Sequence, residues 1–346
     1  MSFVSQVSKN DSRALAQIDA LLQKEGIKRD ANLDYISAIY DDDYNVIATG
    51  SCFGNTLRCF AVDGSRQGEG LTNQLVSHLM QLQMQRGNSH VFVYTKASSA
   101  PFFRDLGFYD IATVESKLVF LENKRNGFES YLQALKAECP PCEGSAAIVM
   151  NANPFTNGHL YLAEQAAANC KALHIFVLSE DASLVPFAVR MRLVKEGTAH
   201  LKNVFVHESG PYMISNATFP SYFLKDEGEV IESHAKLDAA VFVRICKALD
   251  IIMRYVGDEP SSVVTGAYNR VLAEMLPQSG VQCRIIPRKE CEGAAISAGM
   301  VRSLIKSGRT REIKPLVPPC TYSFFTSPEA EPVIEKIKAA ENVIHY

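Results

Sequence analysis

Apolar and polar positions alternate along this chain with two different periods, and the order of those periods separates an earlier part from a later one. Over residues 11–25 the apolar side chains recur three or four positions apart, which predicts an amphipathic helix. Short apolar and β-branched runs, which predict strands, then alternate with further helical patterns. The elements expected after that helix are strands at 45–51 and 56–62, a helix at 70–86, a strand at 91–94, a helix at 100–106 and a strand region from Gly107. This order predicts an α+β domain.

The later part alternates more regularly between short apolar runs and helical patterns. Its expected elements are strand 146–150, helix 159–170, strand 173–178, helix 187–201, strand 204–207, helix 237–255, strand 262–265 and strand 282–286. Strands that alternate with helices predict a Rossmann-like parallel sheet with right-handed crossovers. The fold class is therefore expected to be α/β, and a ligand is expected at the carboxyl ends of the strands.

A break rich in proline separates the two parts. Residues 138–145 read E-C-P-P-C-E-G-S, which ends a helical pattern and precedes an apolar strand. Because 346 residues are many for one core, we expect two domains, 1–137 and 146–346, joined by a linker at 138–145. Cys139 and Cys142 form a C-x-x-C with no second pair of ligands, so a linker is favoured over a zinc site and no metal ligands are assigned.

Composition narrows the function classes. Hydrophobic residues make up 47% of the chain and charged residues 21%, as in a globular protein, and the net charge of −3 argues against a nucleic-acid partner. No apolar stretch reaches the roughly 18 residues of a membrane span. Nine scattered cysteines and an N-terminus without a basic and then apolar pattern predict a cytoplasmic protein with reduced thiols.

The segment that carries chemistry follows the first strand of the later part. It runs from Asn151 to His159 and leads directly into a helix, so free main-chain N–H groups and the positive helix end come together. Such a place binds phosphate, and Gly158 would let a phosphate reach the main chain. Thr156, Asn153 and His159 add a hydroxyl, an amide and an imidazole. The alternative is a simple turn with a histidine at the start of the helix.

Two motifs connect this segment with a known superfamily. Thr156-Asn157-Gly158-His159 resembles the (H/T)-x-G-H motif of the nucleotidyltransferases, and Ile296-Ser297-Ala298-Gly299-Met300-Val301-Arg302 is similar to their I-S-(S/A)-x-x-V-R motif. The resemblance implies that His159, Thr156 and Arg302 are catalytic. The nucleotide-binding residues that it implies are Met150, Asn151, Asn153, Phe155, Thr156, Gly158, His159, Arg190, Gly266, Ile296, Ser297 and Arg302.

The match has two departures from the superfamily pattern. Ala298 and Gly299 replace hydroxyl residues, so main-chain groups are expected to make the phosphate contacts there. Residues 179–186 lack the lysine that many relatives carry, and either Arg190 or Arg192 is expected to supply that charge.

Further stretches resemble one family, citrate lyase ligase, over essentially the whole chain. They are residues 151–162, 186–198, 217–225, 256–260 and 264–269. The resemblance implies an acid–thiol ligase that forms AMP. It would use ATP with Mg²⁺ to join acetate to the thiol of a CoA-like group on the acyl carrier subunit of citrate lyase, by way of acetyl adenylate. No prosthetic group of its own, no membrane and no nucleic acid are implied.

The earlier part contains a second glycine-rich loop before a helix. Residues 62–71 resemble the pyrophosphate loop of GNAT acetyltransferases, and 97–108 resembles the closing helix of that fold. Ser65 stands where the motif has arginine or glutamine. The residues implied to hold the CoA-like arm are Val62, Arg66, Gln67, Gly68, Gly70 and Leu71. The alternative is a scaffold with an empty groove, since the sequence contains no legible acid–base pair.

Two other functions stay open from the sequence. One is a nucleotidyltransferase of the pantetheine-phosphate or nicotinamide-mononucleotide type, which also carries T-x-G-H. The other is a non-catalytic sensor of CoA or nucleotide. Of the remaining histidines, His174 lies in an apolar strand and is expected in the core, while His207 ends a strand and could face either the core or the site.

Overall fold

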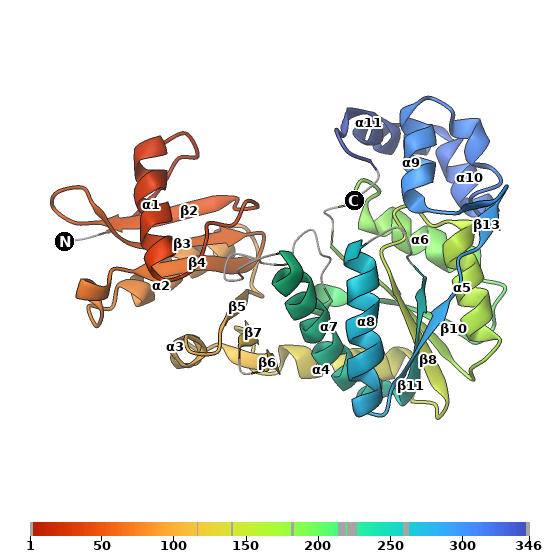
Figure 1. Ribbon diagram of the computed structural model, residues 1–346, viewed down its shortest axis with the longest axis horizontal. Helices are drawn as coiled ribbons and strands as arrows, with labels where there is room; N and C mark the ends of the chain where they lie inside the picture. Colours follow the sequence, from red (N-terminus) through yellow and green to blue (C-terminus); the bar gives the residue numbers. More distant parts are fainter. Residues whose placement is uncertain are drawn as a thin grey trace. The chain divides into compact units, whose positions relative to one another are not determined.

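The computed structural model describes residues 3–115, 117–139, 141–180, 183–213, 219, 227–258 and 263–343 (Figure 1). Contacts between residues divide the chain into two units. The chain leaves the first unit after Gly127 and later returns to it once. The first unit comprises Met1–Gly127 and Phe219–Leu237, and the second comprises Phe128–Thr218 and Asp238–Tyr346. The division by sequence into domains 1–137 and 146–346 with a linker stays a prediction.

A seven-stranded sheet forms the first unit. Its order is β1-β2-β3-β4-β5-β7-β6, and all neighbours are antiparallel except β4 and β5. The strands are β1 Val4–Gln6, β2 Tyr35–Tyr40, β3 Val46–Phe53, β4 Thr56–Val62, β5 Phe92–Lys96, β6 Tyr109–Val114 and β7 Leu118–Glu122, and the helices are α1 Ser12–Lys24, α2 Leu71–Gln85 and α3 Ala100–Asp105. The predicted α+β order is confirmed, while β1 and β2 were not predicted.

Helices α1 and α2 cover opposite faces of this sheet (Figure 1). The apolar stripe of α1, which includes Ile18 and Leu22, packs with Ile36 and Ala38 of β2. The residue between Ile36 and Ala38 has its side chain on the other face of the sheet. Ile39 lies on that other face too, and it packs with Leu75 of α2. The alternation of side chains along β2 therefore divides the core between the two helices.

Strands β4 and β5 separate after a short parallel contact. They pair only at Thr56 with Phe92 and at Leu57 with Val93, although both strands are fully described. The register between β3 and β4 shifts nearby, and Cys59 has a φ of 55°. A bulge of this kind bends a strand and ends its pairing. The later halves of β4 and β5 therefore leave edges that do not pair with each other.

The second unit is built on a five-stranded parallel sheet with the order β10-β9-β8-β11-β12. The strands are β8 Ser145–Met150, β9 Leu173–Val177, β10 Val204–Glu208, β11 Ile251–Gly257 and β12 Gln282–Ile286. The helices are α4 Gly127–Glu138, α5 Asn157–Ala167, α6 Phe187–Thr198, α8 Val263–Gln278, α9 Ala298–Lys306, α10 Pro319–Phe325, α11 Glu331–Ala339 and α7 Glu227–Leu249, whose residues up to Leu237 belong to the first unit. The predicted α/β class with a parallel sheet is confirmed.

The strand order of this sheet reverses beside β8. From β8 the chain builds β9 and β10 on one side, and it then returns to build β11 and β12 on the other. Loops that leave the two central strands at such a reversal diverge and open a crevice at their carboxyl ends. The segment that follows β8 runs from Asn151 to His159, so the topology puts the predicted phosphate loop at this crevice.

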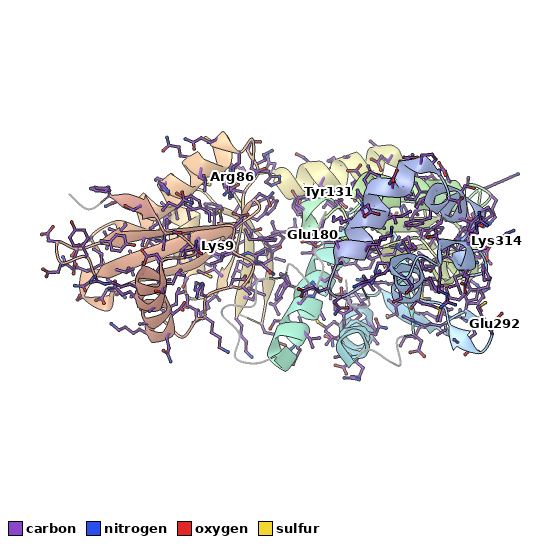
Figure 2. All side chains as sticks on the ribbon, turned by 90° about the horizontal axis from the view of Figure 1, so that it is seen from above. Lys9, Arg86, Tyr131, Glu180, Glu292 and Lys314 are labelled. Atoms are coloured by element: carbon purple, nitrogen blue, oxygen red, sulfur yellow. The ribbon has the colours of Figure 1, made fainter. Side chains whose placement is uncertain are left out.

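Helices cover both faces of the second sheet. Ala163 of α5 and Val194 of α6 belong to the same apolar cluster as Ile175 of β9. On the other face Tyr131 of α4, labelled in Figure 2, donates its hydroxyl to the Glu208 carbonyl at 3.1 Å, and its ring lies 5.0 Å from that of Tyr212. The loop predicted to bind phosphate therefore follows a strand whose sheet is covered on both faces.

Two predicted elements in this unit are wrong. The helix expected at 237–255 ends at Leu249, and the next residues form the strand β11. A strand was expected at 262–265. The described residues of that range, 263–265, instead form the start of helix α8. Asp250, with a φ of 54°, follows the end of α7 and separates it from β11. No glycine or proline marks that break, so the apolar run of β11 reads as a continuation of the helix.

Some sequence inferences fall outside the described residues. These are most of the family-like stretch 217–225, residues 259–260 and Pro140 of the C-x-x-C. Among the described residues, no helix is both long enough and apolar enough to cross a membrane.

Two histidines form a buried pair between β9 and β10. His174 Nδ1 lies 3.0 Å from His207 Nε2, and His207 Nδ1 lies 2.7 Å from a carboxylate oxygen of Glu138. Burial lowers the pKa of His174 to about 4 and also lowers that of His207, although Glu138 acts in the opposite direction on His207. His174 Nε2 has no hydrogen-bond partner among the described residues. The structure thus places both histidines in the core.

This pair predicts a loss of stability in acid. An unfolded histidine has a pKa of about 6.5, so the unfolded state binds protons that the folded pair does not. The free energy of unfolding should fall as the pH drops below about 6.5 and should level off near the folded pKa, by up to about 1.4 kcal/mol per pH unit and histidine. Urea unfolding at several pH values measures this. A His174→Gln variant should show a shallower dependence, and an unchanged slope would contradict the assignment.

Candidate active site

A reciprocal pair of hydrogen bonds joins Thr156 to His159 at the start of α5. The Thr156 main-chain N–H donates to His159 Nδ1 at 3.0 Å, and the Thr156 hydroxyl oxygen accepts from the His159 main-chain N–H at 3.4 Å. This is a capping box in which histidine takes the place of the usual glutamate or glutamine. The motif T-x-G-H is thus a local structure that begins a helix and fixes the histidine ring.

The capping box determines which nitrogen of His159 carries the proton. Because Nδ1 accepts the Thr156 N–H, the neutral ring must carry its proton on Nε2. Burial lowers the pKa of His159 to about 4, and the charges of Arg288 and Arg302 act in the same direction. At neutral pH the ring is therefore a neutral donor through Nε2–H in a positive surrounding. Such a group suits an anion.

Gly158 is needed where α5 meets the second motif. A Cβ at this position would lie 3.2 Å from the carbonyl oxygen of Ile296, so the two motifs are in direct contact. The main-chain N–H groups on either side of it have partners: Asn157 donates to the Leu316 carbonyl at 2.9 Å, and His159 donates to Thr156. Within the described structure, the Gly158 N–H has no such partner. Among the described residues of this turn, it is an open main-chain donor.

Asn153 lies in the loop between β8 and α5 and is 2% exposed. Its side-chain oxygen accepts from the Val185 main-chain N–H at 3.0 Å. Its side-chain nitrogen is buried and has no hydrogen-bond partner among the described residues. A buried amide donor without a partner costs about 1–3 kcal/mol, so a ligand oxygen is a natural acceptor for it.

Arg302 and Arg190 are buried beneath this loop. Arg302 is 2% exposed and donates to the carbonyl oxygens of Asn153 and, at 2.6 Å, Val343. Burial lowers its pKa to about 10. Arg190 is fully buried and donates to the main-chain oxygens of Asn151, Leu178, Glu180 and Val185 at 2.6–3.0 Å. Both guanidinium groups therefore hold the main chain of the loop by hydrogen bonds. Arg192 instead makes an ion pair at 2.9 Å with Glu329.

The other predicted nucleotide residues have varied surroundings. Ser297 caps α9 by accepting from the Met300 N–H at 3.1 Å. Phe155 is fully buried, and its ring is stacked on that of His159 at 5.9 Å. Asn151 accepts from both Arg190 and Ser183 through its side-chain oxygen. Met150 is buried at the end of β8 and Gly266 lies within α8. Their roles toward a nucleotide stay predictions.

Sequence reasoning missed Arg288. It follows β12, is half-buried, and donates from Nε to the Asp258 carbonyl at 2.8 Å. Its charge is the largest charge effect on the pKa of His159. The next residue, Lys289, lies 5.9 Å from the ring centre of Tyr161 on α5. The sequence does contain a signal for this site. Two cationic residues shortly after a strand of a parallel sheet indicate a ligand site, because ligands bind at the carboxyl ends of such strands.

In the first unit the predicted CoA-type residues share one loop. Val62 ends β4, Arg66 pairs with Glu69 at 3.5 Å, and Leu71 begins α2. Gly68 and Gly70 have φ values of 89° and 72°, which favour glycine. No side chain caps α2, and its first three N–H groups have no partner within the described structure. The loop therefore ends on an open helix N-terminus.

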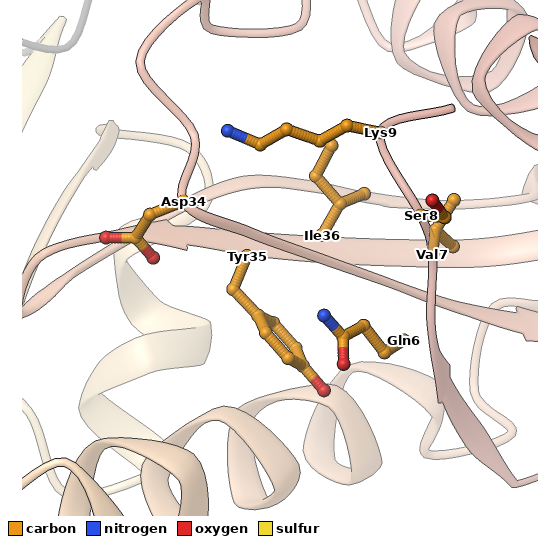
Figure 3. A pocket seen from close by; sticks show the side chains of 7 residues that line it. All are labelled: Gln6, Val7, Ser8, Lys9, Asp34, Tyr35 and Ile36. Carbon is orange, nitrogen blue, oxygen red and sulfur yellow. The ribbon is translucent and has the colours of Figure 1, made fainter. Parts of the chain in front are cut away.

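A separate hollow of about 480 Å³ lies wholly in the first unit (Figure 3). Its polar walls are largely engaged with the protein itself. Tyr35 shares a 2.7 Å hydrogen bond with His78, and Asp34 accepts from Arg86 and from the Gly54 main chain. The residues that line it are Gln6, Val7, Ser8, Lys9, Asp34, Tyr35 and Ile36. We assign it no role.

Comparisons with known proteins show the family to which the chain belongs. Residues 145–325 match the family described as the citrate lyase ligase C-terminal domain, so the second unit contains an enzyme domain of ligase type. The [citrate [pro-3S]-lyase] ligase of Klebsiella pneumoniae is 37% identical over 312 residues, which cover 89% of this chain and 91% of that protein. The chain belongs to the citrate lyase ligase family.

Two solved structures are similar in smaller parts. Thermotoga maritima TmcAL, bound with alpha-thio ATP, has a TM-score of 0.37 and 13% identity and covers 54% of this chain and 56% of its own. A GNAT-family acetyltransferase of Staphylococcus aureus has a TM-score of 0.30 and 12% identity and covers 36% of this chain and all of its own.

The contact at Gly158 predicts a sharp sensitivity to a single methyl group. Gly158→Ala should push the Ile296 carbonyl away and lower the free energy of unfolding by about 1–3 kcal/mol. It should also weaken ATP binding, measured by titration calorimetry, because the open N–H moves. Gly64→Ala is the control, since its Cβ would meet nothing within 4 Å. Equal effects of the two changes would contradict this account.

Proposed function

We propose that this ligase activates acetate with ATP as acetyl adenylate and then transfers the acetyl group to a thiol. The thiol belongs to the CoA-like group of the acyl carrier subunit of citrate lyase. One observation carries the proposal: His159 is held as a neutral Nε2–H donor beside an open main-chain N–H, and the charges of two guanidinium groups lower its pKa. Family membership supports the choice of a citrate lyase as the partner.

In the first half-reaction, an acetate oxygen attacks the α-phosphorus of ATP, and the bond to the β-phosphate oxygen breaks to release pyrophosphate. Little covalent work is needed from the protein, so positioning and charge dominate the rate. His159 Nε2–H and the Gly158 N–H are suited to the α-phosphate oxygens. Arg288 adds positive charge on the same side, and the buried amide of Asn153 can donate to a phosphate or acetate oxygen.

Mg²⁺ is proposed to come to the site with the triphosphate. Among the described residues, no group of three or more histidine, cysteine, aspartate or glutamate side chains could hold a metal ion. This fits Mg²⁺, which proteins commonly bind through substrate phosphates, waters and one or two carboxylates. When bound, the ion would neutralise phosphate charge.

In the second half-reaction the carrier thiolate attacks the acetyl carbonyl, and AMP leaves with the electron pair of the broken bond. We propose that the loop of Val62, Arg66, Gln67, Gly68, Gly70 and Leu71 binds the CoA-like arm that carries this thiol. Its support is the open N-terminus of α2 and the separation of β4 from β5 after their short parallel contact. A cytoplasmic location suits the thiol chemistry, and the nine cysteines of the chain form no disulfide.

Replacing His159 tests the first half-reaction. His159→Ala removes the fixed donor, so acetate-dependent exchange between ATP and pyrophosphate should fall by at least about 100-fold. His200→Ala is a matched control, because His200 is an exposed histidine of the same unit that pairs with Glu164. Exchange at the level of the unaltered protein would remove His159 from this role. A nucleotidyltransferase would require an acceptor other than acetate, and a sensor would turn over neither substrate.

Crowding the first loop tests the second half-reaction. Gly68→Val with Gly70→Val should raise the KM for the deacetylated carrier about tenfold or more, and acetate-dependent exchange should stay unchanged. Gly54→Val is the control, because it introduces a side chain at a φ of 55° with nothing nearby. A normal KM for the carrier in the double variant would mean that the loop does not bind the arm.

A further inference from the structure

The carboxyl end of β11 is held by two side chains that arrive from different elements. Asn269 of α8 donates its side-chain N–H to the Gly257 carbonyl at 3.1 Å. Arg288 donates its Nε–H to the next carbonyl, that of Asp258, at 2.8 Å. The Asp258 N–H is in turn fixed to the Ile286 carbonyl at 2.9 Å. The position of Arg288 therefore depends on where the main chain of Gly257 and Asp258 lies at the end of β11.

Asn269 is well placed to determine that position. Its side chain is 7% exposed, so its amide is shielded from competing water. The preceding residue anchors α8: Tyr268 donates its hydroxyl to a carboxylate oxygen of Asp238, which also accepts from Arg254 of β11 at 2.9 Å. The helix that carries Asn269 is thus bound to β11 at the adjacent residue. A hydrogen bond from a fixed helix can hold the flexible end of a strand.

We propose that Asn269 is a positioning residue for ATP, because its hydrogen bond to Gly257 sets the Asp258 carbonyl that holds Arg288 beside His159. This inference rests on the proposed function. Asn269 itself would touch neither nucleotide nor acetate. Its effect would pass through one peptide group to Arg288 and from there to the phosphates.

The chain offers a matched control for a merely structural asparagine. Asn203 belongs to the same unit, and its side-chain N–H groups donate to the carbonyl oxygens of Ala167 and Cys170 at 2.9 and 3.0 Å. It precedes the amino end of β10, whereas the site lies at the carboxyl ends of the strands. Removing its amide should affect stability without affecting ATP.

The experiment compares Asn269→Asp, Asn203→Asp and Arg288→Gln in the full chain by titration with Mg·ATP. Asn269→Asp keeps the size of the side chain and removes the donor. It should raise the Kd for ATP about five- to tenfold, toward the value of Arg288→Gln, whereas Asn203→Asp should leave it unchanged. In the Arg288→Gln background, Asn269→Asp should have no further effect on the Kd for ATP, because the guanidinium group through which Asn269 acts is gone.

A second measurement follows His159 by NMR of its imidazole nitrogens. Arg288→Gln should raise the pKa of His159, and Asn269→Asp should raise it in the same direction, because Arg288 has moved away. A normal Kd and a normal His159 pKa in Asn269→Asp, while Arg288→Gln alters both, would overturn the inference and leave the proposed function standing. Additive effects in the double variant would also overturn it. If Arg288→Gln leaves ATP binding unchanged, the proposed phosphate role of Arg288 fails instead.

Discussion

The main-chain N–H of Thr156 donates to His159 Nδ1, and the chemistry proposed for the second unit depends on this hydrogen bond. A histidine whose Nδ1 is occupied in this way has one remaining ring proton, on Nε2, and one direction in which to donate it. Burial and two nearby guanidinium groups keep the ring neutral at physiological pH. The bond that begins the helix α5 is therefore also the bond that determines what the histidine can do.

An irregular loop can keep such a geometry only if its main-chain carbonyl groups accept hydrogen bonds from buried side chains that pack against it. The segment after β8 forms no strand or helix until Asn157, so its carbonyl groups need donors of another kind. Arg190 and Arg302 provide them, and a buried guanidinium group is tolerated because several of its N–H groups are hydrogen-bonded. The charge of Arg302 still acts on the pKa of His159, although its hydrogen bonds go to the protein.

Much of this arrangement could be predicted from the sequence, because it depends on local patterns. The periodicities predicted most of the α and β elements in both units, and the nine residues after β8 were predicted to form a phosphate loop at the start of α5. The strand β11 was missed because Asp250 ends a helix without the glycine that usually marks such an end. Arg288 was missed for a different reason. A motif describes residues that are adjacent in sequence, whereas the topology of the sheet brings Arg288 to the end of β12, from where its charge acts on the pKa of His159.

The two glycine-rich loops of this chain differ in a way that bears on their ligands. At the start of α5 the neighbouring N–H groups have protein partners, so Gly158 and the His159 ring remain as donors. Two directed donors suit one phosphate group that undergoes reaction, since the charge that develops there is local. At the start of α2 no side chain caps the helix, and three successive N–H groups are open. A broad set of main-chain donors suits a diphosphate that is bound and left unchanged. The two proposed roles, catalysis at α5 and binding of a long arm at α2, therefore correspond to a difference in how many main-chain donors the protein itself has already used.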